Sequence, residues 1–131
     1  MNEARFPLLE LSLYPAVRTA RKAERVIGEV QRLLPLPLHL LSIAPHESPT
    51  PLFRVDAEVT IDSSGAYPTF AYILEFLRPV HEMWEIVIPS PSLCHTRWHL
   101  WGGTKRTNVI GLAHAYFEAY SEVFSPNEGA V

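Results

Sequence analysis

The strongest constraint on the fold is a strict two-residue alternation that runs from Leu52 to Asp62. Apolar side chains occupy every second position of this stretch, and charged or hydroxyl side chains occupy the positions between them. Successive side chains of a β-strand point to opposite faces of the sheet. The pattern therefore predicts a strand with one face on a core and the other face toward water or a partner.

Other parts of the chain also fit β-strands. Phe6 to Tyr14 alternates in the same manner, and Leu38 to Ala44 is short and almost wholly apolar, which is typical of a strand buried on both faces. Met83 to Ile88 and Leu93 to Trp101 are separated by Pro89-Ser90-Pro91-Ser92. The last two segments therefore predict a β-hairpin with a loop stiffened by prolines.

Two segments follow a helical period. Residues 16–34 carry one broad apolar stripe, with Pro15 before it and Pro35-Leu36-Pro37 after it, and prolines at these positions start and end helices. Asn108 to Phe124 has a similar apolar arc and predicts a second helix, with residues 125–131 as a frayed tail.

The segment from Pro68 to Leu77 fits both periods. Its aromatic content and the turn before it favour a strand. The open alternative is a helix, which would change the element order to a ferredoxin-like βαββαβ core with an added C-terminal helix.

We therefore expect an α+β fold, with residues 1–131 forming a single domain. The predicted order is β-α-β-β-β-β-β-α, with an antiparallel sheet of about five or six strands and two amphipathic helices packed on one face.

Composition excludes several classes of protein. The chain is 47% hydrophobic and 19% charged, which is typical of a globular protein, and its single cysteine excludes a disulfide framework or a thiolate zinc cluster. The net charge of −3 gives no general attraction to nucleic acid or anionic membranes. No apolar run approaches the roughly 20 residues of a membrane span, and the N-terminus lacks the order of a secretion signal. We expect a cytoplasmic protein without a membrane segment, metal or cofactor.

Unusual chemistry gathers between Leu93 and Thr107. This stretch holds two of the three tryptophans, two of the six histidines and the only cysteine. On a strand, two histidines, an arginine and a tryptophan would share one face, where they could hold a carboxylate or phosphate; they are His95, Arg97, His99 and Trp101. The two histidines would lie roughly 13 Å apart, which is too far to share a metal easily. A solvated strand face explains the same residues without a ligand.

Gly102-Gly103 precedes Lys105 and Arg106, and the predicted helix follows. We expect a glycine turn leading to a helix N-terminus, which would favour an anion. The spacing of a Walker phosphate loop is missing, and a simple strand-to-helix turn with Thr104 or Thr107 as N-cap needs no ligand.

The polar side of the segment 16–34 is basic. Its net charge is +3, against −6 for the rest of the chain, and the cations at its start are Arg18, Arg21, Lys22 and Arg25. Such a face can steer an acidic partner or a nucleic-acid backbone. No aromatic residues interleave with these cations, so a nucleic-acid role ranks third and a solvated helix face explains the same pattern.

No catalytic signature emerges. His81-Glu82-Met83-Trp84-Glu85 lacks the second histidine of a metalloprotease motif, and Cys94 and His95 would point to opposite strand faces. Two functions remain. The first is a non-enzymatic binding protein, such as a toxin-neutralising or chaperone-like module, that docks a protein partner or a second copy on an open sheet face. The alternative is a small domain or enzyme that binds an anionic ligand through His95, Arg97, His99, Lys105 and Arg106.

Overall fold

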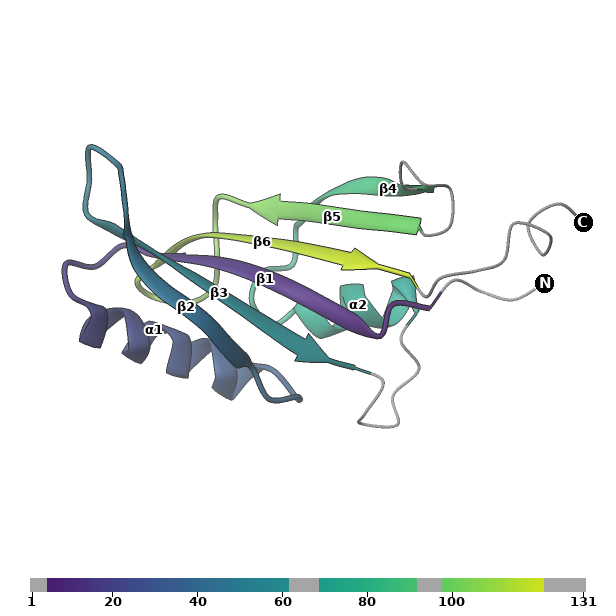
Figure 1. Ribbon diagram of the computed structural model, residues 1–131, viewed down its shortest axis with the longest axis horizontal. Helices are drawn as coiled ribbons and strands as arrows, with labels where there is room; N and C mark the ends of the chain where they lie inside the picture. Colours follow the sequence, from purple (N-terminus) through teal and green to yellow (C-terminus); the bar gives the residue numbers. More distant parts are fainter. Residues whose placement is uncertain (1–4, 62–68, 92–97, 122–131) are drawn as a thin grey trace, which may run out of the picture.

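The computed structural model describes residues 5–61, 69–91 and 98–121. Its six strands form one antiparallel sheet in the order β2-β3-β1-β6-β5-β4, accompanied by two helices (Figure 1). The α+β class is therefore confirmed. In chain order the elements are β1 (Leu8–Pro15), α1 (Ala20–Leu33), β2 (His39–His46), β3 (Leu52–Thr60), α2 (Phe70–Leu77), β4 (Glu85–Pro91), β5 (Trp98–Thr104) and β6 (Leu112–Tyr120).

Strand β1 lies at the centre of the sheet. It pairs with β3 on one side and β6 on the other, so Leu11 lies between Ala57 and Phe117. β2 pairs with the far side of β3, and β1 and β2 therefore run parallel, with α1 as the crossover between them. This arrangement is a split βαβ unit.

The core lies between one face of the sheet and both helices. Every second residue of β1 from Leu9 is buried, and the inward residues of α1 and α2 belong to the same apolar cluster. Each fully buried side chain of this kind contributes about 1.5–3 kcal/mol. The residues that join the layers include Leu9, Leu11, Leu13, Val55, Val59, Val26, Val30, Ile73, Phe76, Leu100 and Phe117.

Helix α1 confirms the helix predicted for residues 16–34, although it begins at Ala20. Pro15 does not start it, because Pro15 is the last residue of β1 and pairs with Leu112. The N-cap is Thr19, whose hydroxyl accepts a hydrogen bond from the backbone N–H of Lys22 at 3.2 Å.

The predicted strand from Pro68 to Leu77 is wrong, and the helical alternative is correct. Thr69 caps α2 by accepting a hydrogen bond from Tyr72 N at 3.3 Å, and Ile73, Phe76 and Leu77 are buried at helical spacing. The aromatic content that favoured a strand reflects packing against the sheet rather than membership of it.

The predicted helix from Asn108 to Phe124 is also wrong, because residues 112–120 form β6 between β1 and β5. From Ala115 onward, buried and exposed residues alternate strictly. Gly111, at φ +90°, belongs to the turn before the strand. The order is therefore β-α-β-β-α-β-β-β. The ferredoxin-like alternative gives the first six elements correctly, but two further strands follow where it placed a C-terminal helix.

Strand β2 corrects the expectation that Leu38 to Ala44 is buried on both faces. It is an edge strand paired only with β3, and all of its side chains except the half-buried Ile43 are exposed. At the other edge, β4 and β5 pair antiparallel as predicted, but the predicted proline loop is wrong, because Pro89, Ser90 and Pro91 belong to β4. Strand β5 starts at Trp98, and residues 92–97 lie outside the described residues. No helix in the described part of the chain is long and apolar enough to cross a membrane.

Candidate functional site

The sheet face opposite the helices is not covered by any described element. Three large aromatic side chains lie exposed on it, with exposed fractions of 37% for Trp101, 39% for Tyr116 and 38% for Tyr120. They come from the neighbouring strands β5 and β6, whose alternate residues Leu100 and Phe117 point into the core. We call this surface the open face.

Three glutamates lie side by side across the open face. Glu10 on β1 is paired with Glu58 on β3 and with Glu118 on β6, and Glu118 is paired in turn with Trp101 on β5. Among the described residues, the side chains of Glu10 and Glu58 make no hydrogen bond or ion pair, and the His99 Nε2 atom lies 3.8 Å from Glu118 Oε1. Like charges directly opposite each other on neighbouring strands destabilise a sheet, so this arrangement has a folding cost. We call Glu58, Glu10 and Glu118 the glutamate row.

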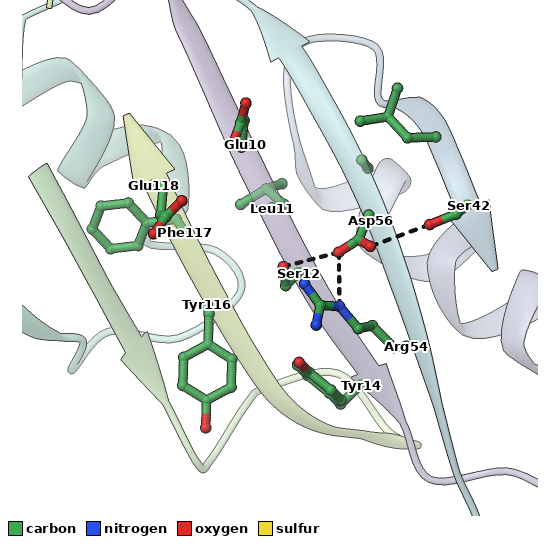
Figure 2. A pocket seen from close by; sticks show the side chains of 12 residues that line it. Glu10, Leu11, Ser12, Tyr14, Ser42, Arg54, Asp56, Tyr116, Phe117 and Glu118 are labelled. Carbon is green, nitrogen blue, oxygen red and sulfur yellow. Dashed lines mark hydrogen bonds and ion pairs between the residues drawn. The ribbon is translucent and has the colours of Figure 1, made fainter. Parts of the chain in front are cut away.

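Asp56, two residues before Glu58 on β3, is fully engaged within the protein. It accepts hydrogen bonds from Ser12 Oγ at 3.0 Å, Ser42 Oγ at 3.2 Å and Arg54 Nε at 3.1 Å, so it ties β1 and β2 to β3 (Figure 2). Burial raises the pKa of the Asp56 carboxyl, but the hydrogen bonds from Arg54 and the two serines outweigh burial and lower that pKa overall. Asp56 is therefore a structural cross-link with little capacity left for a ligand.

A hollow of about 420 Å³ lies on the open face. Figure 2 shows its walls, where Glu10 and Glu118 lie on neighbouring strands and Tyr14 and Tyr116 lie near one end. The two tyrosine rings meet edge to face, with centroids 5.7 Å apart. Carboxylates beside aromatic rings suit a cationic group, because both the charge and the ring faces attract it.

His99 is packed into the aromatic part of the open face. Its ring stacks on Tyr120, with centroids 4.4 Å apart and 5° between the planes, and its centroid lies 4.5 Å from that of Trp101. The Nε2 atom is buried and has no hydrogen-bond partner. Its nearest charged neighbour is Glu118, so this part of the face suits an anion poorly.

The structure separates the residues predicted as an anion site. His99 and Trp101 share the open face of β5 as expected, whereas Lys105 and Arg106 lie exposed in the loop after the strand. By strand rise, Lys105 is roughly 20 Å from His99. The predicted helix N-terminus at this loop does not exist, since β6 follows. His95 and Arg97, the other two members, lie outside the described residues.

The hydroxyls predicted as helix caps hold this loop instead. Thr104 Oγ1 donates to Arg106 O at 2.6 Å and accepts from Arg106 N at 3.1 Å. Thr107 Oγ1 donates to Leu112 O at 2.7 Å and accepts from Val109 N at 3.3 Å. These hydrogen bonds fix the turn that leads into β6.

The prediction of a glycine turn is likewise wrong, because Gly102 and Gly103 lie within β5. Their missing side chains make room for aromatic rings on β6. A Cβ atom on Gly102 would lie 2.8 Å from the Phe117 ring, and one on Gly103 would lie 2.3 Å from the Tyr116 ring. The glycines therefore let one ring pack into the core and the other lie flat on the open face.

The predicted basic face is exposed on the helix side of the sheet. The inward residues of α1 are apolar, so its cations point away from the sheet. Charge is thus segregated, with cations outside the helix layer and the glutamate row on the opposite face. The exposed cations are Arg18, just before the helix, and Arg21, Lys22 and Arg25 within it.

The glutamate row and the tyrosines beside it, Tyr116 and Tyr120, were not predicted from the sequence, whereas Trp101 was. Alternation indicates the polar side of β1 and β3, but it does not give the register that brings Glu10 beside Glu58. Glu118, Tyr116 and Tyr120 were missed because their segment was assigned to a helix.

The described residues contain no group of three or more histidine, cysteine, aspartate or glutamate side chains that could hold a metal ion. Comparisons with protein-family models, curated proteins and solved structures find no match. The chemistry of the open face is therefore the basis for inferring a function.

Proposed function

We propose that the protein is a non-enzymatic binding protein that docks a partner protein on the open face of its sheet, as a toxin-neutralising or chaperone-like module would. The observation that carries this proposal is the exposure of Trp101, Tyr116 and Tyr120 together on an uncovered face. Tryptophan and tyrosine are enriched at the centres of protein interfaces and supply much of the binding energy there.

The sheet holds these side chains in place before a partner arrives. Tyr116 lies over Gly103, and Tyr120 is stacked on His99, which is itself packed beside Trp101. Rings held in this way lose little conformational freedom on binding, so more of their contact energy is available for affinity.

The anionic-ligand alternative remains a prediction with less support. Of the residues predicted for that site, Lys105 and Arg106 lie beyond the end of β5, and His99 faces Glu118. The carboxylates of the open face would repel an anion, and the basic helix face lies on the other side of the sheet.

Photo-crosslinking tests where the partner docks. p-Benzoylphenylalanine would replace Tyr116 in one variant and Ile110, which is 95% exposed in the turn before β6, in a control variant. We expect the Tyr116 position to crosslink one distinct protein in extract of the native host, and the Ile110 position not to do so.

The crosslinked protein would then be purified and its affinity measured by calorimetry. Trp101→Ala should weaken binding about 30-fold, corresponding to a tryptophan anchor worth about 2 kcal/mol. Equal crosslinking from both positions, together with unchanged affinity for Trp101→Ala, would refute docking on this face.

A further inference from the structure

The charge of the open face indicates which partner it fits. We propose that the partner presents a cationic segment, with lysine or arginine side chains that bind along the glutamate row. This inference rests on the proposed docking function and adds the chemistry of the partner to it.

The glutamate row has a cost to the isolated protein. Glu10 has a like charge directly beside it on both neighbouring strands, and no described cation neutralises it. Arg54, the arginine on the same face of β3, is held by Asp56. A partner that brings cations relieves this repulsion on binding, so the same charges that weaken the free sheet favour the complex.

Exposed aromatic side chains surround Glu118. Tyr116 and Tyr120 lie two residues before and after it on the same side of β6, and Trp101 lies opposite it on β5. A lysine or arginine that reaches Glu118 would therefore meet exposed aromatic rings as well as a carboxylate. Cation–π contacts add to the ion pair and favour a side chain that carries both charge and an apolar stem.

The glutamates of the row are evenly spaced. Neighbouring strands lie about 4.8 Å apart, so the backbone positions of the three glutamates form a line with that pitch across β3, β1 and β6. Cations placed three or four residues apart on a helix lie at about the same separation. A basic helix face laid across the strands matches the row, and this spacing sets the probe for the experiment.

A second copy of this chain also has a basic helix, α1, but it is a poorer occupant. Docking of α1 on the open face of another molecule would be a head-to-tail contact, which forms open polymers unless the rotation between copies closes a ring. We therefore assign the row to a different, cationic protein and treat self-association as an outcome of the test.

The test uses a labelled 17-residue alanine-based peptide with arginine at every fourth position, and a matched peptide with glutamine at those positions. Fluorescence anisotropy would measure their binding to the full chain and to the double variant Glu10→Gln/Glu118→Gln. The control variant, Glu24→Gln/Glu82→Gln, changes the net charge equally but alters exposed glutamates away from the row.

We expect the arginine peptide to bind and the glutamine peptide not to bind. The arginine peptide should bind about tenfold more weakly to the row variant than to the control variant, as the loss of two surface ion pairs implies. Raising the salt concentration should reduce the difference between the variants. Equal affinity for the row and control variants would overturn the inference. So would light scattering that shows salt-sensitive polymers of the protein alone, because α1 of a second copy would then occupy the face.

The two proposals fail in different ways. If Trp101→Ala weakens binding of the purified partner but Glu10→Gln/Glu118→Gln does not, the docking function stands and the cationic partner is refuted. If neither change affects the partner, docking on the open face itself is refuted.

Discussion

Replacing Gly102 by alanine tests the packing of β5 against β6. The added Cβ atom would lie 2.4 Å from the backbone oxygen of Glu85 and 2.8 Å from the Phe117 ring. Neither neighbour can move freely. The oxygen belongs to the backbone of β4, and the Phe117 side chain is 1% exposed, with the ring of Trp84 packed edge-on against it at 5.6 Å between centroids. The methyl group therefore requires the strands themselves to shift.

Overpacking of this kind costs about 3 kcal/mol. Unfolding entropy of about 2.1 cal/mol/K per residue gives about 0.28 kcal/mol/K for the 131-residue chain, so we expect Gly102→Ala to lower Tm by about 10 °C. Circular dichroism during thermal unfolding would measure the change.

Two other glycines provide matched controls. At Gly103 the added methyl meets mainly the ring of Tyr116, which is 39% exposed, so displacing this ring costs less than displacing a buried one and the loss should stay below about 1.5 kcal/mol. At Gly28 on α1 nothing lies within 4 Å, and alanine should stabilise the helix by about 0.5–1 kcal/mol. If Gly102→Ala and Gly103→Ala unfold at the same temperature, the packing of Phe117 over Gly102 is refuted.

Two further changes test the polar side chains of the open face. Glu10→Gln removes the repulsion of Glu10 by Glu58 and Glu118, so it should stabilise the protein by about 0.5–1 kcal/mol at low salt and by less at 1 M salt. Glu24→Gln is the control and should leave the stability unchanged. An unaltered Tm for Glu10→Gln would contradict the repulsion. Asp56→Asn tests the lowered pKa of Asp56. The ionised carboxylate stabilises the fold above its ordinary pKa near 4, and this stabilisation is lost as the pH falls through the lower pKa that Asp56 has in the folded protein. Urea unfolding at pH 7 and pH 3 should show the deficit of Asp56→Asn shrinking at pH 3, and a deficit independent of pH would contradict the carboxylate network.

Long, strict alternation made part of the fold predictable. In β1 and β3 the pattern fits only one regular structure, because a one-residue shift would turn every apolar side chain toward water. The stripe of α1 runs for nearly four turns and is equally specific. These elements define the central sheet and one of the two covering helices.

The types of α2 and β6 could not be decided from local pattern. Leu112, Ala113, Tyr116, Phe117 and Tyr120 satisfy a helical stripe, while Ala115, Phe117 and Ala119 alternate as in a strand, and the aromatic residues of 70–77 likewise fit both structures. Pairing with β1 and β5 makes β6 a strand, and its pairing with β1 joins residues about a hundred positions apart. Gly111, whose positive φ suits a turn, was the local signal against a continuous helix.

The candidate site was less predictable than the fold, because it is formed by register. Glu10, Glu58 and Glu118 come from three distant strands, and a shift of β1 by two residues would leave each strand's pattern intact while separating the row. Of the residues predicted from the sequence, His99 and Trp101 lie at this site because their own strand was assigned correctly.

The wrong prediction for β2 bears on the same surface. Its sequence has the apolar content of a buried strand, yet Leu40 and Leu41 are 42% and 53% exposed at the sheet edge. Leu41 lines the same hollow as Glu10 and Tyr116, so a partner seated on the glutamate row would also cover this part of the edge. The opposite edge strand, β4, carries Pro89 and Pro91, which lack the N–H groups that would pair with another strand. Docking as proposed above would therefore cover Leu41, whereas Leu40, which is paired with the core residue Ala57, faces the helix side of the sheet, so only the exposure of Leu41 counts in favour of that proposal.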